Sequence, residues 1–92
     1  MDKVYSKNPD VVFRKIADEF VLVPIRQKAV DLKSIYTLNE VGAFIWELID
    51  GVKTTAQIRD RVVEDFEVDP FGAEADITEI LSQLESLSLI CA

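Results

Sequence analysis

Apolar residues in the first third of the chain fall in short runs that are rich in β-branched and aromatic side chains. One run extends over Val11–Ile16 and a second over Phe20–Val23, and the polar segment 17–19 separates them. Two such runs around a short polar connection predict a β-hairpin. Pro24 has no N–H to donate to a ladder, so we expect the second strand to end there and residues 26–28 to form a polar turn.

A third strand is expected within Val30–Leu38. Successive side chains of a strand point to opposite faces. The first face then holds Val30, Leu32, Ser34, Tyr36 and Leu38, and the second holds Asp31, Lys33, Ile35 and Thr37. Charged residues such as Asp31 and Lys33 are typical of an edge strand, where they discourage unwanted pairing.

Helical periodicity begins directly after this strand. Asn39 is the predicted N-cap of a first helix, and Gly51 is predicted at its C′ position, just past Asp50. Trp46 borders the apolar stripe of this helix and is expected to pack against the sheet or a neighbouring helix. The stripe consists of Val41, Phe44, Ile45, Leu48 and Ile49.

Two further helices follow. Thr54 or Thr55 caps the second, with Gln57 as the reciprocal partner of Thr54 in a capping box. Asp69 is the predicted N-cap of the third, with Pro70 at its first position. The apolar faces are Ile58, Val62 and Phe66 in the second helix, and Ile77, Ile80, Leu81, Leu84 and Leu87 or Ser88 in the third.

Three strands followed by three helices predict an α+β fold, with a three-stranded antiparallel sheet and a winged-helix-like order of helices. The chain has 92 residues, of which 49% are hydrophobic, so it can bury one modest core. We therefore expect a single domain over residues 1–92 with its core in about residues 11–90.

The charge distribution argues against nucleic-acid binding, which a winged-helix order would otherwise suggest. The net charge is −7, and residues 62–92 contain no Lys or Arg but eight carboxylates. Affinity for a phosphate backbone depends on basic residues, and the later helix of a helix-turn-helix is the one that enters the major groove. The predicted third helix lacks the basic side chains for that role.

The sequence also predicts no membrane segment and no internal disulfide. No apolar run approaches the length of a membrane span, and no signal peptide is recognisable. Cys91 is the only cysteine. We therefore expect a cytoplasmic protein in a reducing compartment, with Cys91 either incidental or a reactive thiol.

No constellation of residues predicts catalysis, a metal site or a cofactor. The chain has no His, no recognisable nucleophile elbow and no Gly-rich phosphate loop. The acidic group over residues 64–69 lacks the spacing and glycine of a calcium loop and is expected to be a solvated surface. An acid–base pair of carboxylates is the one enzymatic alternative that the sequence leaves open.

The segment from Tyr36 to Gly51 carries a recognisable motif. It reads Tyr-Thr-Leu-Asn-Glu-Val-Gly at its start and Ile-Trp-Glu-Leu-Ile-Asp-Gly at its end. Together with Thr54–Ile58 and the Val-Asp-Pro start of the last helix at residues 68–70, the chain resembles the PqqD-like family. The resemblance covers about residues 11–90 and is most specific in Leu38–Gly51.

The chain departs from the family pattern at two places. Members carry a Gly-Leu pair after the last helix, whereas this chain has Ser88 and Leu89, which leaves the form of the C-terminal cap open. The connection from Ile25 to Ser34 is longer than the simplest hairpin turn. A longer connection beside the third strand can alter what that strand accepts.

The resemblance implies peptide binding. In the family, a leader peptide adds as an antiparallel strand to the third strand and lies between it and the last helix. Carried over by position, the strand edge is Lys33, Ser34, Ile35, Tyr36 and Thr37. Helical angles place the opposite wall on one flank of the last helix, formed by Ala73, Asp76, Ile80, Gln83 and Leu87. Lys33 and Asp76 would contact charged positions of the peptide, and Ile80 and Leu87 would hold an apolar anchor.

The resemblance also implies a protein partner. The leader belongs to a ribosomally made precursor peptide and is presented to a separate modifying enzyme, often a radical-SAM maturase, so the domain needs no cofactor of its own. Exposed parts of the acidic helical half are expected to dock this enzyme.

Three alternatives stay open at this point. The chain can instead be an interaction subunit of an operon with no peptide product, or a winged-helix nucleic-acid binder, which its charges disfavour. The exposed sheet edge also permits a homodimer, which would compete with the leader for the same backbone groups.

Overall fold

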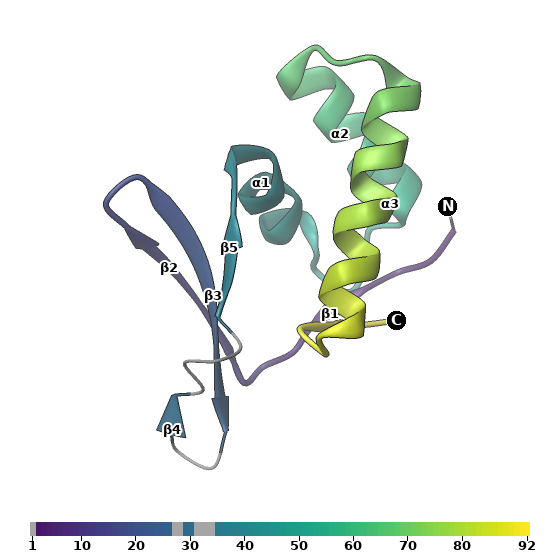
Figure 1. The fold of residues 1–92 in the computed structure, drawn as a ribbon. Coiled ribbons are helices and arrows are strands. Elements are labelled where there is room, and N and C mark those ends of the chain that lie inside the picture. The colour runs from purple at the N-terminus through teal and green to yellow at the C-terminus, as the bar shows by residue number, and fades with distance from the viewer. Residues whose placement is uncertain (1, 27–28, 31–34) are drawn as a thin grey trace.

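The fold consists of an antiparallel sheet with three helices packed on one face of it (Figure 1). The computed structural model describes residues 2–26, 29–30 and 35–92. The elements in chain order are β1 (Ser6–Lys7), β2 (Val11–Ile16), β3 (Glu19–Arg26), β4 (Ala29–Val30), β5 (Tyr36–Leu38), α1 (Glu40–Leu48), α2 (Thr55–Phe66), α3 (Pro70–Ser86) and β6 (Ile90–Cys91). The α+β architecture expected from the sequence is confirmed.

The predicted hairpin is confirmed, with β2 and β3 paired antiparallel from Val11 opposite Pro24 to Ile16 opposite Glu19. The chain reverses through a two-residue turn in which Ala17 has a φ of 54°. The prediction that the second strand ends at Pro24 was wrong, because β3 continues to Arg26. Arg26 therefore belongs to a strand, and the other two residues of the predicted polar turn lie outside the described part of the chain.

The position of Pro24 explains why it does not end the strand. The amide of Ile25 faces β2, where it donates to the carbonyl of Asp10 at 2.7 Å. Successive amides of a strand point to opposite edges, so the nitrogen of Pro24 faces away from β2. On that side β3 changes partner from β5, which pairs with residues 20–22, to β4, which pairs with residues 25–26. Pro24, which has no N–H donor, therefore lies where β3 changes from one partner strand to the other.

β5 pairs antiparallel with β3, from Phe20 opposite Leu38 to Leu22 opposite Tyr36, in a four-stranded sheet that also contains β2 and the short strand β4. This confirms the end of the strand expected within residues 30–38, of which residues 31–34 lie outside the described part. Leu38 is buried, Tyr36 is half-buried and Thr37 is exposed. The inward and outward faces of β5 are therefore those that the alternation predicted.

All three helices begin at their predicted caps. The side-chain oxygen of Asn39 caps α1, and Thr54 caps α2 in a capping box with Gln57. Asp69 caps α3, with Pro70 in its first turn. Each cap satisfies an N–H that has no partner within its helix.

The turn after α1 requires a glycine, although not at the predicted position. The C-cap of α1 is Ile49, so Gly51 lies one residue beyond C′. Gly51 has a φ of 78°, and a Cβ there would lie 3.0 Å from the Oγ of Ser6. Both the backbone conformation and the closeness of Ser6 disfavour a larger residue.

Asp50 closes the same turn through its carboxylate. It accepts from the Nζ of Lys53 at 2.6 Å and from the amides of Lys53 and Val52, each at 2.9 Å. These hydrogen bonds hold the pKa of Asp50 well below its usual range, and the bond from the Lys53 side chain has the largest effect. A carboxyl whose pKa is lowered by folding stabilises the fold above its ordinary pKa of about 4 and loses this contribution as the pH falls.

The core lies between the inward face of the sheet and one stripe of each helix. Trp46 belongs to it, whereas Phe66, predicted in the buried stripe of α2, is only half-buried and packs at the border of the core. Gly42 allows α1 to approach β5, since a Cβ there would lie 3.0 Å from the Cδ2 of Leu38. The largest fully buried side chains are Leu22, Ile45, Ile49, Ile58, Val62, Ile77, Leu81, Leu84, Leu89 and Ile90.

Residues 3–8 cross the helical side of the molecule as an extended segment, here called the N-terminal strap. Its strand β1 pairs antiparallel with β6 at the other end of the chain. The carbonyl of Tyr5 accepts from the amide of Gly51 at 3.0 Å, and the carbonyl of Lys3 accepts from the amide of Thr55 at 2.9 Å. Tyr5 is only 7% exposed and joins the core. The strap therefore contributes a buried side chain to the core from a segment that precedes the first predicted strand.

α3 ends in a left-handed turn at Ser88, which has a φ of 60°. The amide of Ser88 donates to the carbonyl of Glu85 at 3.0 Å, and the amide of Leu89 donates to the carbonyl of Leu84 at 2.9 Å. This is the hydrogen-bond pattern of a Schellman cap, in which glycine is the favoured residue at the left-handed position. Serine performs that role here.

Replacement of Tyr5 by alanine tests the importance of the strap. We expect Tyr5→Ala to lower the free energy of unfolding by about 3–5 kcal/mol, because it removes a buried aromatic side chain. Urea unfolding followed by the fluorescence of Trp46 measures this. Phe71→Ala, at a residue that is 84% exposed, is the control and should leave the midpoint nearly unchanged. Equal midpoints for the two variants would contradict a structural role for the strap.

A glycine at residue 88 should stabilise the protein. We expect Ser88→Gly to raise the free energy of unfolding by about 0.5–1 kcal/mol, since it relieves the left-handed conformation at a small entropic cost. Ser86→Gly, at the last helical residue, is the matched control and should lower stability by a similar amount. Thermal unfolding compares both variants with the natural chain, and a loss of stability in Ser88→Gly would show that the turn is not strained.

Candidate functional site

A groove follows one flank of α3, between this helix and the start of α1. It has a volume of about 290 Å³. Its lining residues are Asn39 and Val41 from α1 and Asp76, Glu79, Ile80 and Gln83 from α3. Because Asn39 follows β5 directly in the chain, this α3 groove opens beside the end of that strand.

The edge of β5 forms the second part of the site. β5 pairs with β3 on one side, and no strand in the described part of the chain pairs with its other side. Of the predicted edge residues, Ile35 is 40% exposed, Tyr36 is half-buried and Thr37 is exposed. Lys33 and Ser34 lie outside the described residues. At the described end of β5, the backbone N–H and C=O groups on its unpaired side are therefore available beside the α3 groove.

The predicted residues of α3 divide into three groups. Asp76, Ile80 and Gln83 line the groove together, as the helical angles suggested. Ala73 is 2% exposed and belongs to the core, because it falls on the same helical stripe as Ile77. Leu87 is the C-cap of α3 and is 46% exposed, beyond the residues that line the groove.

A side-chain hydrogen bond joins the two parts of the site. The hydroxyl of Tyr36 donates to the Oε1 of Gln83 at 2.5 Å, across 47 positions of sequence. Tyr36 reaches α3 because its side chain lies on the inward face of β5. The bond adds a polar connection between strand and helix, and it leaves the amide NH₂ of Gln83 as a donor.

Three groove residues were not predicted, namely Asn39, Val41 and Glu79. Asn39 was predicted only as the N-cap of α1, a role that it also fills, since its side chain accepts from the amide of Gly42 at 2.7 Å. Two signals were available. Helix α1 starts with no connection after β5, so its first turn must lie at the strand edge, and Glu79 stands three positions after Asp76 on α3.

Charge and apolar surface lie together in the groove. Asp76 and Glu79 supply two carboxylates on the helical wall, and Ile80 supplies a half-buried apolar side chain between them and Gln83. Within residues 2–26, 29–30 and 35–92, no group of three or more potential ligands gathers to hold a metal ion. The groove can bind by hydrogen bonds, charge and an apolar contact.

None of the helices in the described ranges is long and apolar enough to cross a membrane.

A family model connects the chain with known proteins. The model for coenzyme PQQ synthesis protein D (PqqD) matches residues 19–90. This range contains both β5 and α3, and so includes both parts of the site. No curated protein matches the chain in sequence.

Solved structures share the fold over nearly the whole chain. TbiB1 in complex with the TbiA(beta) leader peptide is 27% identical, with a TM-score of 0.73, and 92% of this chain and 93% of that chain are covered. A lasso peptide synthetase B1 complexed with the leader peptide is 18% identical, with a TM-score of 0.77 and coverage of 98% and 100%.

A third structure is the PqqD truncation of Methylobacterium extorquens PqqCD, described as a functional and stand-alone recognition element for ribosomally synthesised and post-translationally modified peptides. It is 22% identical, with a TM-score of 0.73, and 97% of this chain and 89% of that chain are covered. At these identities, the second and third structures show the fold alone.

A double-mutant cycle tests the hydrogen bond between β5 and α3. We expect Tyr36→Phe and Gln83→Ala to show a coupling of about 0.5–1 kcal/mol in the free energy of unfolding, the range of one partly exposed hydrogen bond. Urea unfolding of the two single variants and the double variant measures it. Strictly additive effects would mean that the two side chains do not interact in solution.

Proposed function

This chain belongs to the family of coenzyme PQQ synthesis protein D, and we propose that it binds the leader segment of a ribosomally made precursor peptide for a separate modifying enzyme. The observation that carries the proposal is the open edge of β5 beside the α3 groove. The same fold occurs in two structures that contain a leader peptide, TbiB1 and the lasso peptide synthetase B1. The family assignment and the site geometry thus support the same function.

The leader would bind as an additional antiparallel strand. Unpaired N–H and C=O groups on the outer edge of β5 provide a ladder for an extended peptide whatever its sequence, and side-chain contacts would fix its register. Within the described residues this ladder involves Ile35, Tyr36 and Thr37. Lys33 and Ser34 would extend it by their position in the chain.

The helical wall would select the sequence of the leader. Asp76 and Glu79 favour a basic side chain, since a carboxylate accepts charge-assisted hydrogen bonds from Lys or Arg. Ile80 offers an apolar contact close to these charges. The free amide NH₂ of Gln83 can donate to a carbonyl of the leader while its oxygen stays bonded to Tyr36. We therefore propose a leader that presents one basic and one apolar side chain to α3, on alternate positions of the strand.

The domain would act as a recognition subunit in the cytoplasm and would require no cofactor. Its site holds a peptide and supplies no group that we assign to catalysis. The chemistry would belong to the modifying enzyme, for which a radical-SAM maturase is our first choice. Presentation would then raise the effective concentration of the precursor at that enzyme.

Proline substitutions in the leader test strand addition. The probe is a fluorescent leader peptide from the precursor encoded nearest to this chain's gene, and anisotropy measures its affinity. Proline removes one backbone donor. We expect proline at positions whose amide faces β5 to weaken binding by about tenfold or more, and proline at the intervening positions to have less effect.

Alanine at each of the same positions is the matched control. It keeps the backbone donor and removes only the side chain, so at positions whose amide faces β5 proline should weaken binding more than alanine does. Identical losses in the two series would mean that side chains alone hold the leader. Binding without any loss in the proline series would exclude the added strand.

A further inference from the structure

β5 and α3 run in opposite directions along the two sides of the site (Figure 1). Tyr36, the first residue of β5, donates its hydroxyl hydrogen bond to Gln83, near the end of α3. Asn39, which follows the last residue of β5, lines the α3 groove together with Asp76, seven positions before Gln83. A leader that adds antiparallel to β5 would therefore run parallel to α3, from Asp76 toward Gln83.

The alternation of β5 decides which leader side chains meet α3. Residues directly opposite each other in an antiparallel pair point to the same face of the sheet. Leu38 is buried and Tyr36 is half-buried, whereas Thr37 between them is exposed. The leader residues opposite Leu38 and Tyr36 would thus face the helix. Because the two strands are antiparallel, the residue opposite Leu38 comes first in the leader, and the residue opposite Tyr36 comes two positions later.

The helical wall offers different chemistry to these two leader positions. Asp76 is the first groove residue of α3, and Ile80 follows it by four positions, which is about 6 Å along the helix. Side chains on one face of a strand recur every two residues, which is about 6.6–6.8 Å. Because the two spacings are similar, one register of the leader can bring its first inward side chain to Asp76 and its second to Ile80.

Asp76 favours a basic side chain at the first position. The residues that line the groove include two carboxylates and no Lys or Arg, but Glu79 also lines the hollow that contains Phe71. Among the ion pairs of the described residues, Glu74 has Arg59 at 3.5 Å, whereas none includes Asp76. A Lys or Arg of the leader would donate a charge-assisted hydrogen bond to this carboxylate.

Ile80 favours an apolar side chain at the second position. Ile80 is half-buried and packs against the core, as does Tyr36 on the strand side. The hydroxyl of Tyr36 already donates to Gln83. An apolar leader side chain would therefore meet apolar surface at this position, whereas a charged one would lose hydration without gaining a partner.

We propose that the leader carries a Lys or Arg two positions before a large apolar residue, with the basic side chain at Asp76 and the apolar side chain at Ile80. This order rests on the proposed function and deepens it, because it adds a direction and a sequence rule to a leader that binds at β5. The opposite order would bring the apolar residue to Asp76 and the charged residue to Ile80, so neither would meet a complementary side chain.

Exchanging the two leader residues tests the order. The probe is the fluorescent leader peptide of the proline series. Anisotropy compares it with a peptide in which the Lys or Arg and the apolar residue have changed places, so that composition, length and net charge stay the same. We expect the exchange to weaken binding by about tenfold. Equal affinities, or a natural leader that binds without a Lys or Arg two positions before an apolar residue, would overturn the proposal.

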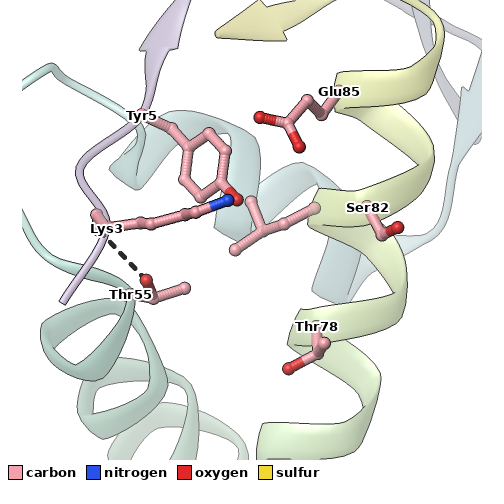
Figure 2. Close-up of a pocket in the computed structure, with 7 residues that line it drawn as sticks. Lys3, Tyr5, Thr55, Thr78, Ser82 and Glu85 are labelled. Atoms are coloured by element: carbon pink, nitrogen blue, oxygen red, sulfur yellow. Dashed lines mark hydrogen bonds between the residues drawn. The ribbon is translucent and has the colours of Figure 1, made fainter. Parts of the chain in front are cut away.

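A charge reversal identifies the partner of the basic residue. We expect Asp76→Lys to weaken binding of the natural leader by about fivefold or more, since repulsion replaces attraction. The same variant should strengthen binding of a leader whose Lys or Arg is replaced by Glu. Glu85→Lys is the matched control, because Glu85 is exposed and lies nine positions from Asp76, about two and a half turns, on the opposite flank of α3. There it lines a separate hollow of about 350 Å³ over Tyr5 (Figure 2).

The control separates the effect of Asp76 from that of net charge. Glu85→Lys should change the affinities for the two leaders far less than Asp76→Lys does, and equal effects of the two variants would overturn the proposal. The natural domain and the natural leader test the proposed function separately. If they bind with the expected proline pattern, strand addition stands even where the order of the two residues proves wrong. No binding between them would contradict both.

Discussion

The buried apolar stripe of α3 holds this helix at a fixed distance from β5, and the α3 groove depends on that distance. Ile77, Leu81 and Leu84 anchor the helix in the core, and Leu89 and Ile90 continue the same buried surface beyond its end. The hydrogen bond from Tyr36 to Gln83 adds one polar connection across the gap. Because the stripe faces the core, the two flanks of α3 remain free, one beside β5 and one beside the N-terminal strap.

Features set by neighbouring residues could be predicted from the sequence. The hairpin, the third strand and the three helix caps follow from turn residues, alternation and side chains such as Asn39 and Asp69, which bond within three positions. The strap could not be predicted in this way. Its strand β1 pairs with a strand more than eighty residues away, and a two-residue strand has no periodicity of its own. The prediction that the strand ends at Pro24 was wrong for a related reason. The cost of a proline in a strand depends on whether its nitrogen faces a partner strand, which the local sequence does not show.

The site could be predicted in part for the same reasons. Helical angles brought Asp76, Ile80 and Gln83 to one flank, but they could not decide where the core stripe ends, so Ala73 was assigned to the surface although it is buried. The contribution of α1 to the groove depends on how α1 and α3 pack, which no local pattern encodes. The exposed side chain of Phe71 and the hollow over Tyr5 are also products of packing.

The central claim is that a leader peptide becomes a strand of this sheet at β5. Isotope-filtered NMR on the labelled domain with an unlabelled leader measures this directly, through nuclear Overhauser contacts between the two chains. The account predicts cross-strand contacts from α-protons of the leader to the backbone of Ile35–Thr37, together with side-chain contacts to Ile80. Contacts confined to the outer edge of β2, or to the flank of α3 beside the N-terminal strap, would contradict it.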